Sequence, residues 1–271
     1  MNAGSAVCTL RDCAIFVRPT FVDYLRSGWA ISMVTAIDFT ASNGNPKNPS
    51  SLHAMGQNNQ YVEALIQVGT IIEPYDADRS FPVFGFGGVP RFAGQAGVSH
   101  CFPLNGNPSN PEIIGIEGII GEYQMKISQI DLAGPTLFNP LLEQFLMYTR
   151  EVVKVSSVYQ VLLLLTDGAI HDMEPTKKTI VELSQLPCSI IIVGVGSADF
   201  SAMEELDGDG GKLRDSRGRP CRRDVVQFVE YREAIKRGNL AEQVLKEVPG
   251  QVVTHMEAIN FRPSYIQPPG Y

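Results

Sequence analysis

Apolar residues in this chain form short continuous runs that alternate with segments of helical spacing. The continuous runs predict strands at residues 30–37, 81–86, 159–165, 189–195 and 224–229. Segments in which apolar residues return every three or four positions predict helices at residues 59–72, 113–130, 139–155, 176–186 and 240–256. Continuous apolar strands separated by helices favour a parallel sheet that is covered on both faces. We therefore expect an α/β fold, doubly wound, with a mostly parallel central sheet flanked by helices on both faces.

Local signals refine three of the predicted helices. The apolar residues between Ile113 and Ile130 follow a 3-4-3-4-3 spacing, which predicts one continuous amphipathic helix. Asn139 is expected to cap the next helix, with Pro140 at its first position. Proline 249 and the glycine after it should bend or interrupt the last predicted helix.

The first predicted strand ends at a polar pentapeptide, Asp38-Phe39-Thr40-Ala41-Ser42. Its carboxylate and two hydroxyls stand at alternate positions, so the turns of a loop can direct all three towards one point. Hard oxygen ligands of this type suit magnesium or manganese better than zinc or copper. A polar turn in which Asp38 and Ser42 serve as caps explains the pentapeptide alone equally well.

Further oxygen donors are expected at the same edge of the sheet. In an open parallel sheet, ligands bind beyond the carboxyl ends of the strands, where the winding reverses. Asp167 follows the predicted strand 159–165, and Thr136 lies in a Gly-Pro-Thr loop before that strand. Capping explains one or two of these residues but not the whole set. We therefore predict a metal site formed by Asp38, Thr40, Ser42, Thr136 and Asp167.

Three residues near this set are assigned supporting roles. Asn43 and Gly44 are expected to shape the loop rather than to bind the metal. Asp172, five residues after Asp167, is expected to be a turn or cap residue; the alternative is that it orients a metal-bound water.

Catalytic functions are the alternative to metal-dependent binding. A magnesium-dependent phosphotransferase or phosphatase could use Asp38 as its nucleophile. Enzymes of the haloacid-dehalogenase type need a second acid two residues later, where this chain has Thr40. A nucleotide-binding kinase would need a GxxxxGK[ST] loop, which the sequence lacks. The glycine-rich segment 207–211 lacks the glutamate of an EF-hand calcium loop, so we expect a solvent turn there.

Composition and charge narrow the partner classes. The chain has 271 residues, 44% of them hydrophobic, and a net charge of −7 without long charged runs, whereas nucleic-acid surfaces cluster their lysines and arginines. The one basic cluster, Arg214 to Arg223, is interpreted as a solvated loop. No stretch approaches the ~20 apolar residues of a membrane span, and the first residues lack a signal-peptide pattern. We expect neither nucleic-acid binding nor direct membrane insertion.

Cysteine and histidine usage predicts no zinc site or disulfide framework. The five cysteines are scattered and form no CxxC pair, which favours a reducing compartment. The four histidines lie far apart and are each expected at a surface or capping position: His53, His100, His171 and His255.

Several motifs of this chain resemble those of the copine family. The segment from Ala36 to Pro46 (AIDFTASNGNP) is similar to the copine signature. Further similar segments are Gly85-Phe86-Gly87, Val98-Ser99-His100, Phe102 to Asn107, Thr166-Asp167-Gly168, Ser189 to Gly196, Glu205 to Asp209 and Arg223 to Phe228. The strand-end aspartate, the two hydroxyls, the distant threonine and the later Asp-Gly resemble the metal-ion-dependent adhesion site of von Willebrand factor A-type domains, which have a Rossmann-like fold.

The resemblance covers about Pro19 to Pro263. It departs from the adhesion-site pattern at Thr40, a threonine that copines share and that keeps the hydroxyl. Residues 137–150 and the segment around Asp131 are less copine-like, so a different partner preference is expected.

The resemblance implies a protein-binding module rather than an enzyme. It implies a divalent cation, Mg²⁺ or Mn²⁺ with Ca²⁺ as the alternative, that takes a carboxylate from an Asp or Glu of an intracellular protein partner. Copines carry two calcium-dependent, phospholipid-binding β-sandwich modules before this domain. Phospholipid binding with Ca²⁺ is therefore expected only of those modules, and cytoplasmic location with recruitment to membranes is expected of the full-length protein.

The same resemblance predicts the domain organisation. Residues 1–18 are expected to be a linker or remnant of the preceding lipid-binding module, because Ala6 to Val17 resemble its last strand. Residues 19–260 are expected to form the von Willebrand factor A-type domain, and residues 261–271 a C-terminal tail. Both lipid-binding modules would then be absent, and the chain would be a fragment or a truncation.

Overall fold

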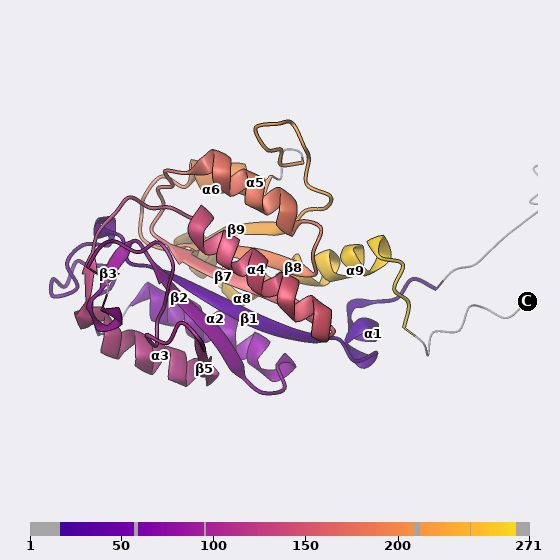
Figure 1. The fold of residues 1–271 in the computed structure, drawn as a ribbon, viewed down its shortest axis with the longest axis horizontal. Helices are drawn as coiled ribbons and strands as arrows, with labels where there is room; N and C mark the ends of the chain where they lie inside the picture. The colour runs from indigo at the N-terminus through magenta and orange to yellow at the C-terminus, as the bar shows by residue number, and fades with distance from the viewer. Residues whose placement is uncertain (1–16, 57–58, 95, 209–211, 239, 264–271) are drawn as a thin grey trace, which may run out of the picture.

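A central sheet of parallel strands organises the fold (Figure 1). The computed structural model describes residues 17–56, 59–94, 96–208, 212–238 and 240–263. The strands of the sheet are β1 (Ala30–Asp38), β2 (Ser80–Phe86), β4 (Phe102–Pro103), β5 (Glu112–Ile114), β7 (Val158–Thr166), β8 (Cys188–Gly194) and β9 (Val226–Glu230). They are ordered β4-β2-β1-β7-β8-β9, with β5 also paired to β2. Strands β2, β1, β7, β8 and β9 are parallel to one another, and β4 and β5 are antiparallel to β2.

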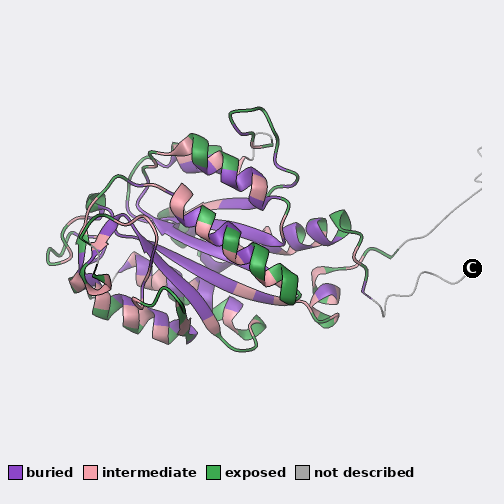
Figure 2. Cartoon of the chain, viewed as in Figure 1, coloured by how far each residue is buried: buried purple, intermediate pink, exposed green. Residues whose placement is uncertain are grey.

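Helices cover both faces of this sheet (Figures 1 and 2). They are α1 (Phe21–Arg26), α2 (Gln60–Ile72), α3 (Gly115–Lys126), α4 (Asn139–Val155), α5 (Met173–Leu183), α6 (Ser201–Asp207), α7 (Tyr231–Lys236), α8 (Leu240–Leu245) and α9 (Val248–Ala258). Alternate residues of β7 serve the two faces: Val161 and Leu163 join the core with α2, α3 and α9, whereas Leu162 and Leu164 join the core with α4 and α5. The predicted doubly wound α/β fold is confirmed.

The predicted helix from residue 113 to residue 130 is too long. Helix α3 begins only at Gly115, whose φ is +69°. The residues before it form β5, in which Ile113 pairs with Phe81 of β2. At the other end, Ile127 starts a 3-10 turn, η4 (Ile127–Gln129), and Ile130 starts β6 (Ile130–Leu132). Strand β6 pairs with β3 (Gly88–Pro90) in a small antiparallel sheet. The regular spacing of isoleucines predicted a single helix because the short strands at both ends of this segment also direct isoleucines towards the core.

The predicted cap of α4 is also wrong. Asn139 is the first residue of α4, and its Oδ1 accepts a hydrogen bond from the hydroxyl of Thr179 at 2.7 Å. The cap comes from Asp172, whose carboxylate accepts hydrogen bonds from the backbone N–H groups of Phe138 (3.0 Å) and Asn139 (2.8 Å). Asp172 is therefore a capping residue, as predicted, but of a helix distant in sequence.

The last predicted helix is interrupted, as expected. Helix α8 ends at Leu245 and α9 begins at Val248, with the proline at 249 in its first turn, where its missing N–H has no intrahelical partner to lose. Other boundaries shift by a few residues, as in α5 (Met173–Leu183) and β9 (Val226–Glu230).

The basic segment from residue 214 to residue 223 is only partly solvated. Asp215 is buried and accepts hydrogen bonds from the backbone of Arg217 and Arg219. Arg223 is also buried, and its guanidinium donates to the carbonyls of Leu186 and Cys188. The prediction of a solvated loop is therefore wrong for these two residues.

The ends of the chain lie mostly outside the described residues. The predicted module remnant falls there except for its last two residues, of which Arg18 forms an ion pair with Glu257. Of the predicted tail, Phe261 packs against Tyr24 and Trp29. The described cysteines, Cys101, Cys188 and Cys221, are free thiols, whereas Cys8 and Cys13 fall outside the described part. Within the described ranges, no helix is both long and apolar enough to cross a membrane.

Candidate metal centre

Two neighbouring strands end in acidic and hydroxyl side chains where the winding of the sheet reverses. From β1 the chain proceeds to β2 on one side and later returns to β7 on the other side of β1. The register pairs Ile37 with Leu165, so the next residues, Asp38 and Thr166, are adjacent. The hydroxyl of Thr166 donates to Asp38 Oδ2 at 2.7 Å. Thr166 is not among the five predicted ligands, although its position just before Asp167 is a signal that could have identified it.

The loop after β1 directs two more hydroxyls to the same point. The backbone N–H and the Oγ1 hydroxyl of Thr40 both donate to Asp38 Oδ1, at 2.8 and 2.6 Å. The 3-10 turn η1 (Ala41–Asn43) then places Ser42 Oγ 3.0 Å from Thr40 Oγ1. Asn43 holds this turn, since its Nδ2 donates to the carbonyl of Thr40 and its Oδ1 accepts from the hydroxyl of Tyr61.

Asp167 completes a pair of buried carboxylates. Asp38 is 0% exposed and Asp167 is 5% exposed, and Asp167 Oδ1 has no hydrogen-bond partner in the described part of the chain. Burial raises the pKa of Asp38 to about 7, and the negative charge of Asp167 adds to this rise. Burial also raises the pKa of Asp167, against a hydrogen bond from Ser42 that lowers it. No described lysine or arginine forms an ion pair with either carboxylate.

Thr136 lies in a loop that passes between these elements. Ala133 accepts a hydrogen bond from the N–H of Ala41 at 2.6 Å, and the Thr136 carbonyl accepts one from the N–H of His171 at 3.0 Å. Thr136 is 3% exposed. Within the described ranges, no hydrogen bond joins its hydroxyl to the other predicted ligands. The structure thus links Asp38, Thr40, Ser42 and Asp167 directly, and brings the backbone of Thr136 to the adjoining loops.

A buried histidine supports the backbone of Asp38. His53 is 0% exposed, and its ring stacks on Tyr61 with the centroids 4.5 Å apart. Burial lowers the pKa of His53 to about 3, so the ring is neutral. Nε2 then donates to the carbonyl of Asp38 (2.9 Å), and Nδ1 accepts from the hydroxyl of Tyr123 (2.8 Å).

The predicted surface or capping position is therefore wrong for His53, and it is also wrong for His255, which is 4% exposed in α9. A single histidine in a polar stretch gave no signal of burial. Among the described residues, no group of three or more His, Cys, Asp or Glu side chains is arranged to hold a metal ion.

The donor set nevertheless fits a hard divalent cation. It consists of two carboxylates and several hydroxyls, and magnesium uses one or two carboxylates while keeping several waters. Such an ion would give the unpartnered oxygen of Asp167 a ligand contact, and it would compensate the negative charge of the two buried carboxylates.

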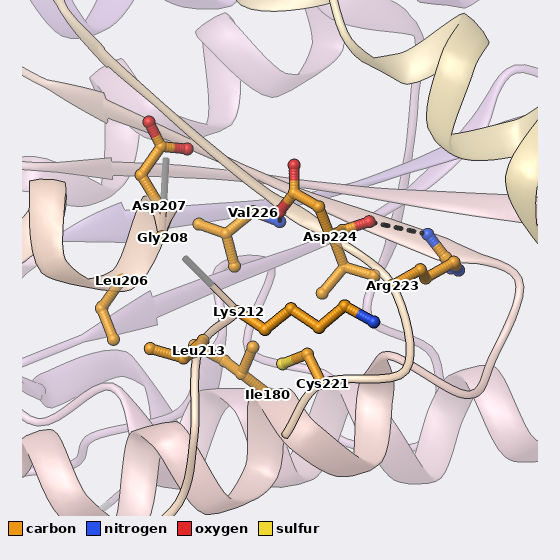
Figure 3. Close-up of a pocket in the computed structure, with 11 residues that line it drawn as sticks. Ile180, Leu206, Asp207, Gly208, Lys212, Leu213, Cys221, Arg223, Asp224 and Val226 are labelled. Carbon is orange, nitrogen blue, oxygen red and sulfur yellow. Dashed lines mark hydrogen bonds between the residues drawn. The ribbon is translucent and has the colours of Figure 1, made fainter. Parts of the chain in front are cut away.

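A separate pocket of about 290 Å³ lies between α5, α6 and β9, on the face of the sheet that α4 and α5 cover (Figure 3). Lys212 extends across it near Cys221, and Arg223 donates a hydrogen bond to the backbone carbonyl of Asp224. None of the five predicted metal ligands lines this pocket.

Known proteins are similar in sequence to this chain. The family model described as Copine matches residues 51–264, which include Thr136 and Asp167 but begin after Ser42. Protein BONZAI 1 of Arabidopsis thaliana is 45% identical over 254 residues, which cover 91% of this chain and 43% of that protein. The chain thus spans less than half the length of this curated relative.

Solved structures that align with this chain do so at low sequence identity. The manganese-loaded TRAP protein of Plasmodium vivax aligns with a TM-score of 0.47 and 13% identity, over 76% of this chain and 71% of that chain. The VWA domain of SpRpn10 aligns with a TM-score of 0.42 and 10% identity, over 74% of this chain and 87% of that chain.

Proposed function

Because the chain belongs to the copine family and has a doubly wound α/β fold, we propose that it is a metal-dependent protein-binding module of the von Willebrand factor A type. Asp38, Thr40, Ser42, Thr136 and Asp167 hold the cation, directly or through water. A protein partner then supplies an Asp or Glu carboxylate to a position that the chain leaves open.

The observation that carries this proposal is the pair of buried carboxylates without a cationic partner. Asp38 and Asp167 together place up to two negative charges in a site where burial raises both pKa values. A bare pair of this kind destabilises the folded chain, because charges removed from water need a compensating charge. A divalent cation supplies that charge, and Mg²⁺ or Mn²⁺ suits these oxygen donors, with Ca²⁺ as the alternative.

The two aspartates of the site have different surroundings and therefore different roles. Thr166 and Thr40 occupy both oxygens of Asp38 with hydrogen bonds, which fixes the orientation of that carboxylate. The unpartnered oxygen of Asp167 is available to an ion or to a water bound to it. With only two acidic side chains in the set, a bound cation keeps part of its positive charge and attracts an external carboxylate.

In a longer copine, this module would act beside lipid-binding modules. We propose calcium-dependent phospholipid binding, and recruitment from the cytoplasm to membranes, only for those lipid-binding modules. The assignment of residues 1–18 to a preceding module is part of the same proposal. Residues 19–260 form the proposed protein-binding domain.

Capture of protein partners tests the proposal. Beads that carry the wild-type chain, Asp167→Asn or the control Glu143→Gln are incubated with cell extract in Mg²⁺ or in EDTA, and retained proteins are identified by mass spectrometry. Glu143 is an exposed residue of α4, so its substitution changes charge without touching the site. We expect a set of proteins that wild type and control retain in Mg²⁺ and lose in EDTA, and that Asp167→Asn does not retain. Retention by Asp167→Asn at the wild-type level would contradict the proposal, as would magnesium-dependent phosphate release from a phosphoester that Asp38→Asn abolishes.

A further inference from the structure

A groove of about 680 Å³ adjoins β6 and the loop after β1, residues 39–44, which we call the metal loop. Ala41 and Gly44 of the metal loop line one end of it, next to Ser42. The last turn of α3, the segment η4 and β6 line another part, on the side of the fold where β3 lies (Figure 1), and Lys47, Met55 and Arg91 are also among the lining residues. We call this feature the β6 groove. Because Ala41 and Gly44 flank Ser42 in the sequence and line the groove, a peptide bound at the metal site can continue into it.

The β6 groove carries an excess of positive charge, although the chain as a whole has a net charge of −7. Lys47 is exposed, and no acidic side chain of the described residues lies within ion-pair distance of its ammonium group. Arg91 is 57% exposed; its Nη2 donates to the carbonyl of Ser128 at 2.7 Å, and its Nη1 lies 3.6 Å from Asp131 Oδ1. Among the described lining residues, Asp131 is the one acidic side chain, so two cations face one anion. The contacts to Ser128 and Asp131 hold the guanidinium in place while more than half of its side chain stays accessible.

The floor of the β6 groove is apolar. Ile127 and Ile130 line it and are each 4% exposed, so their side chains are already packed against the core. Met55 also lines the groove and is 43% exposed. A flexible, partly exposed methionine beside an apolar floor can adapt to an apolar side chain of a ligand.

We propose that the β6 groove determines which partner binds at the metal site. The partner it favours is an extended acidic segment that carries a second carboxylate. The first carboxylate of the segment completes the metal site, an apolar residue packs beside Met55 and Ile127, and the second carboxylate reaches Lys47 and Arg91. This inference rests on the proposed metal-dependent binding and names the class of its partner. Charge complementarity carries it, because the groove combines two accessible cations with a direct connection to the metal loop.

A displayed random-peptide library tests the inference on the whole chain. Peptides are selected on the wild-type chain in Mg²⁺, and those also retained in EDTA are discarded. The selected peptides are synthesised, and their affinities are measured by fluorescence anisotropy. We expect them to contain at least two acidic residues separated by an apolar residue.

Two variants with equal charge change then locate the second carboxylate. Lys47→Glu combined with Arg91→Glu should weaken a selected peptide at least tenfold at low salt. The control pair, Lys178→Glu and Arg217→Glu, changes exposed cations on the side of the sheet that α5 and α6 cover, and should weaken it less than twofold. Replacing the second acid of the peptide with its amide should remove most of the difference between wild type and the groove variant.

The outcomes separate this inference from the proposed function. Magnesium-dependent peptides that carry a single acid, or that bind the groove variant as tightly as wild type, would overturn the β6 groove assignment and leave the metal-dependent module intact. A selection that yields no magnesium-dependent peptide would overturn both.

Discussion

Metal binding should offset more than half of the stability that the wild-type chain loses, relative to Asp38→Asn, by burying the Asp38 charge. Burial raises the pKa of Asp38 from its ordinary value of 3.8 to about 7, so the folded state holds a proton more tightly than the unfolded state. The free energy of unfolding therefore falls as pH rises from about 4 to about 7, and the penalty is fully present above pH 7. At 1.36 kcal/mol for each pKa unit, it amounts to about 4 kcal/mol in the metal-free chain at pH 7.5 or above.

Asparagine removes this charge and keeps most of the local contacts. Its oxygen can still accept from the backbone N–H of Thr40, and its amide can donate to the hydroxyl of Thr166. Asp38→Asn should therefore be at least as stable as wild type in EDTA. In Mg²⁺ or Mn²⁺ at a hundred times the dissociation constant, wild type should gain about 2.7 kcal/mol. For a domain of this size, the gain corresponds to a Tm increase of about 5–10 °C.

Thermal unfolding followed by circular dichroism checks both halves of this prediction, with Glu143→Gln as the matched control. We expect wild type and control to show the metal-dependent Tm increase, and Asp38→Asn to show none. An equal increase in Asp38→Asn would refute the site, because the ion would then bind elsewhere. A large loss of Tm for Asp38→Asn in EDTA would refute the reasoning from charge burial.

Three further predictions concern residues around the site and the core. Asp172→Ala should lower the free energy of unfolding by about 1 kcal/mol through loss of the α4 cap while keeping the metal-dependent Tm increase; an abolished increase would instead make Asp172 part of the metal site. Gly87→Ala should lower the free energy of unfolding by about 1–3 kcal/mol and reduce the metal-dependent Tm increase, because φ is +78° and a Cβ would lie 2.2 Å from Thr40 Cγ2. The control Gly28→Ala has a φ of +98° but open space around it, so it should lower the free energy of unfolding and leave the metal-dependent Tm increase unchanged. Burial lowers the pKa of His255 to about 4, so the contribution of its neutral form to stability is fully present above pH 6.5 and falls by up to about 1 kcal/mol per pH unit as pH drops from 6.5 to 4. In urea unfolding, the free energy of wild type minus that of His255→Asn should therefore fall over this range, and a difference that does not change with pH would contradict this assignment.

The strongest predictions from sequence rested on patterns that local chemistry sets. Continuous apolar runs identified β1, β7 and β8, because a strand buried on both faces needs apolar side chains at every position. The same reasoning placed Asp38 and Asp167 at one edge, since parallel strands align their carboxyl ends. Four of the five predicted ligands are directly linked by hydrogen bonds or by electrostatic interaction.

The errors arose where residues distant in sequence determine the structure. The spacing from Ile113 to Ile130 could not show that β2 and β3 would each pair with one end of that segment. The cap of α4 comes from Asp172, so the sequence around Asn139 could not indicate it.

By itself, the sequence determined the order of the five longest strands and of the main helices between them, the edge at which the acidic and hydroxyl side chains meet, and the family. These depend on periodicity, on strand ends and on motifs, all of which are local. Only the tertiary structure decided that Thr166 bonds to Asp38, that His53 is buried and neutral beneath it, and that a cationic groove adjoins the metal loop. Each of these depends on strand register or on packing between distant segments, and the physical reason is that burial and charge compensation are set by neighbours in space.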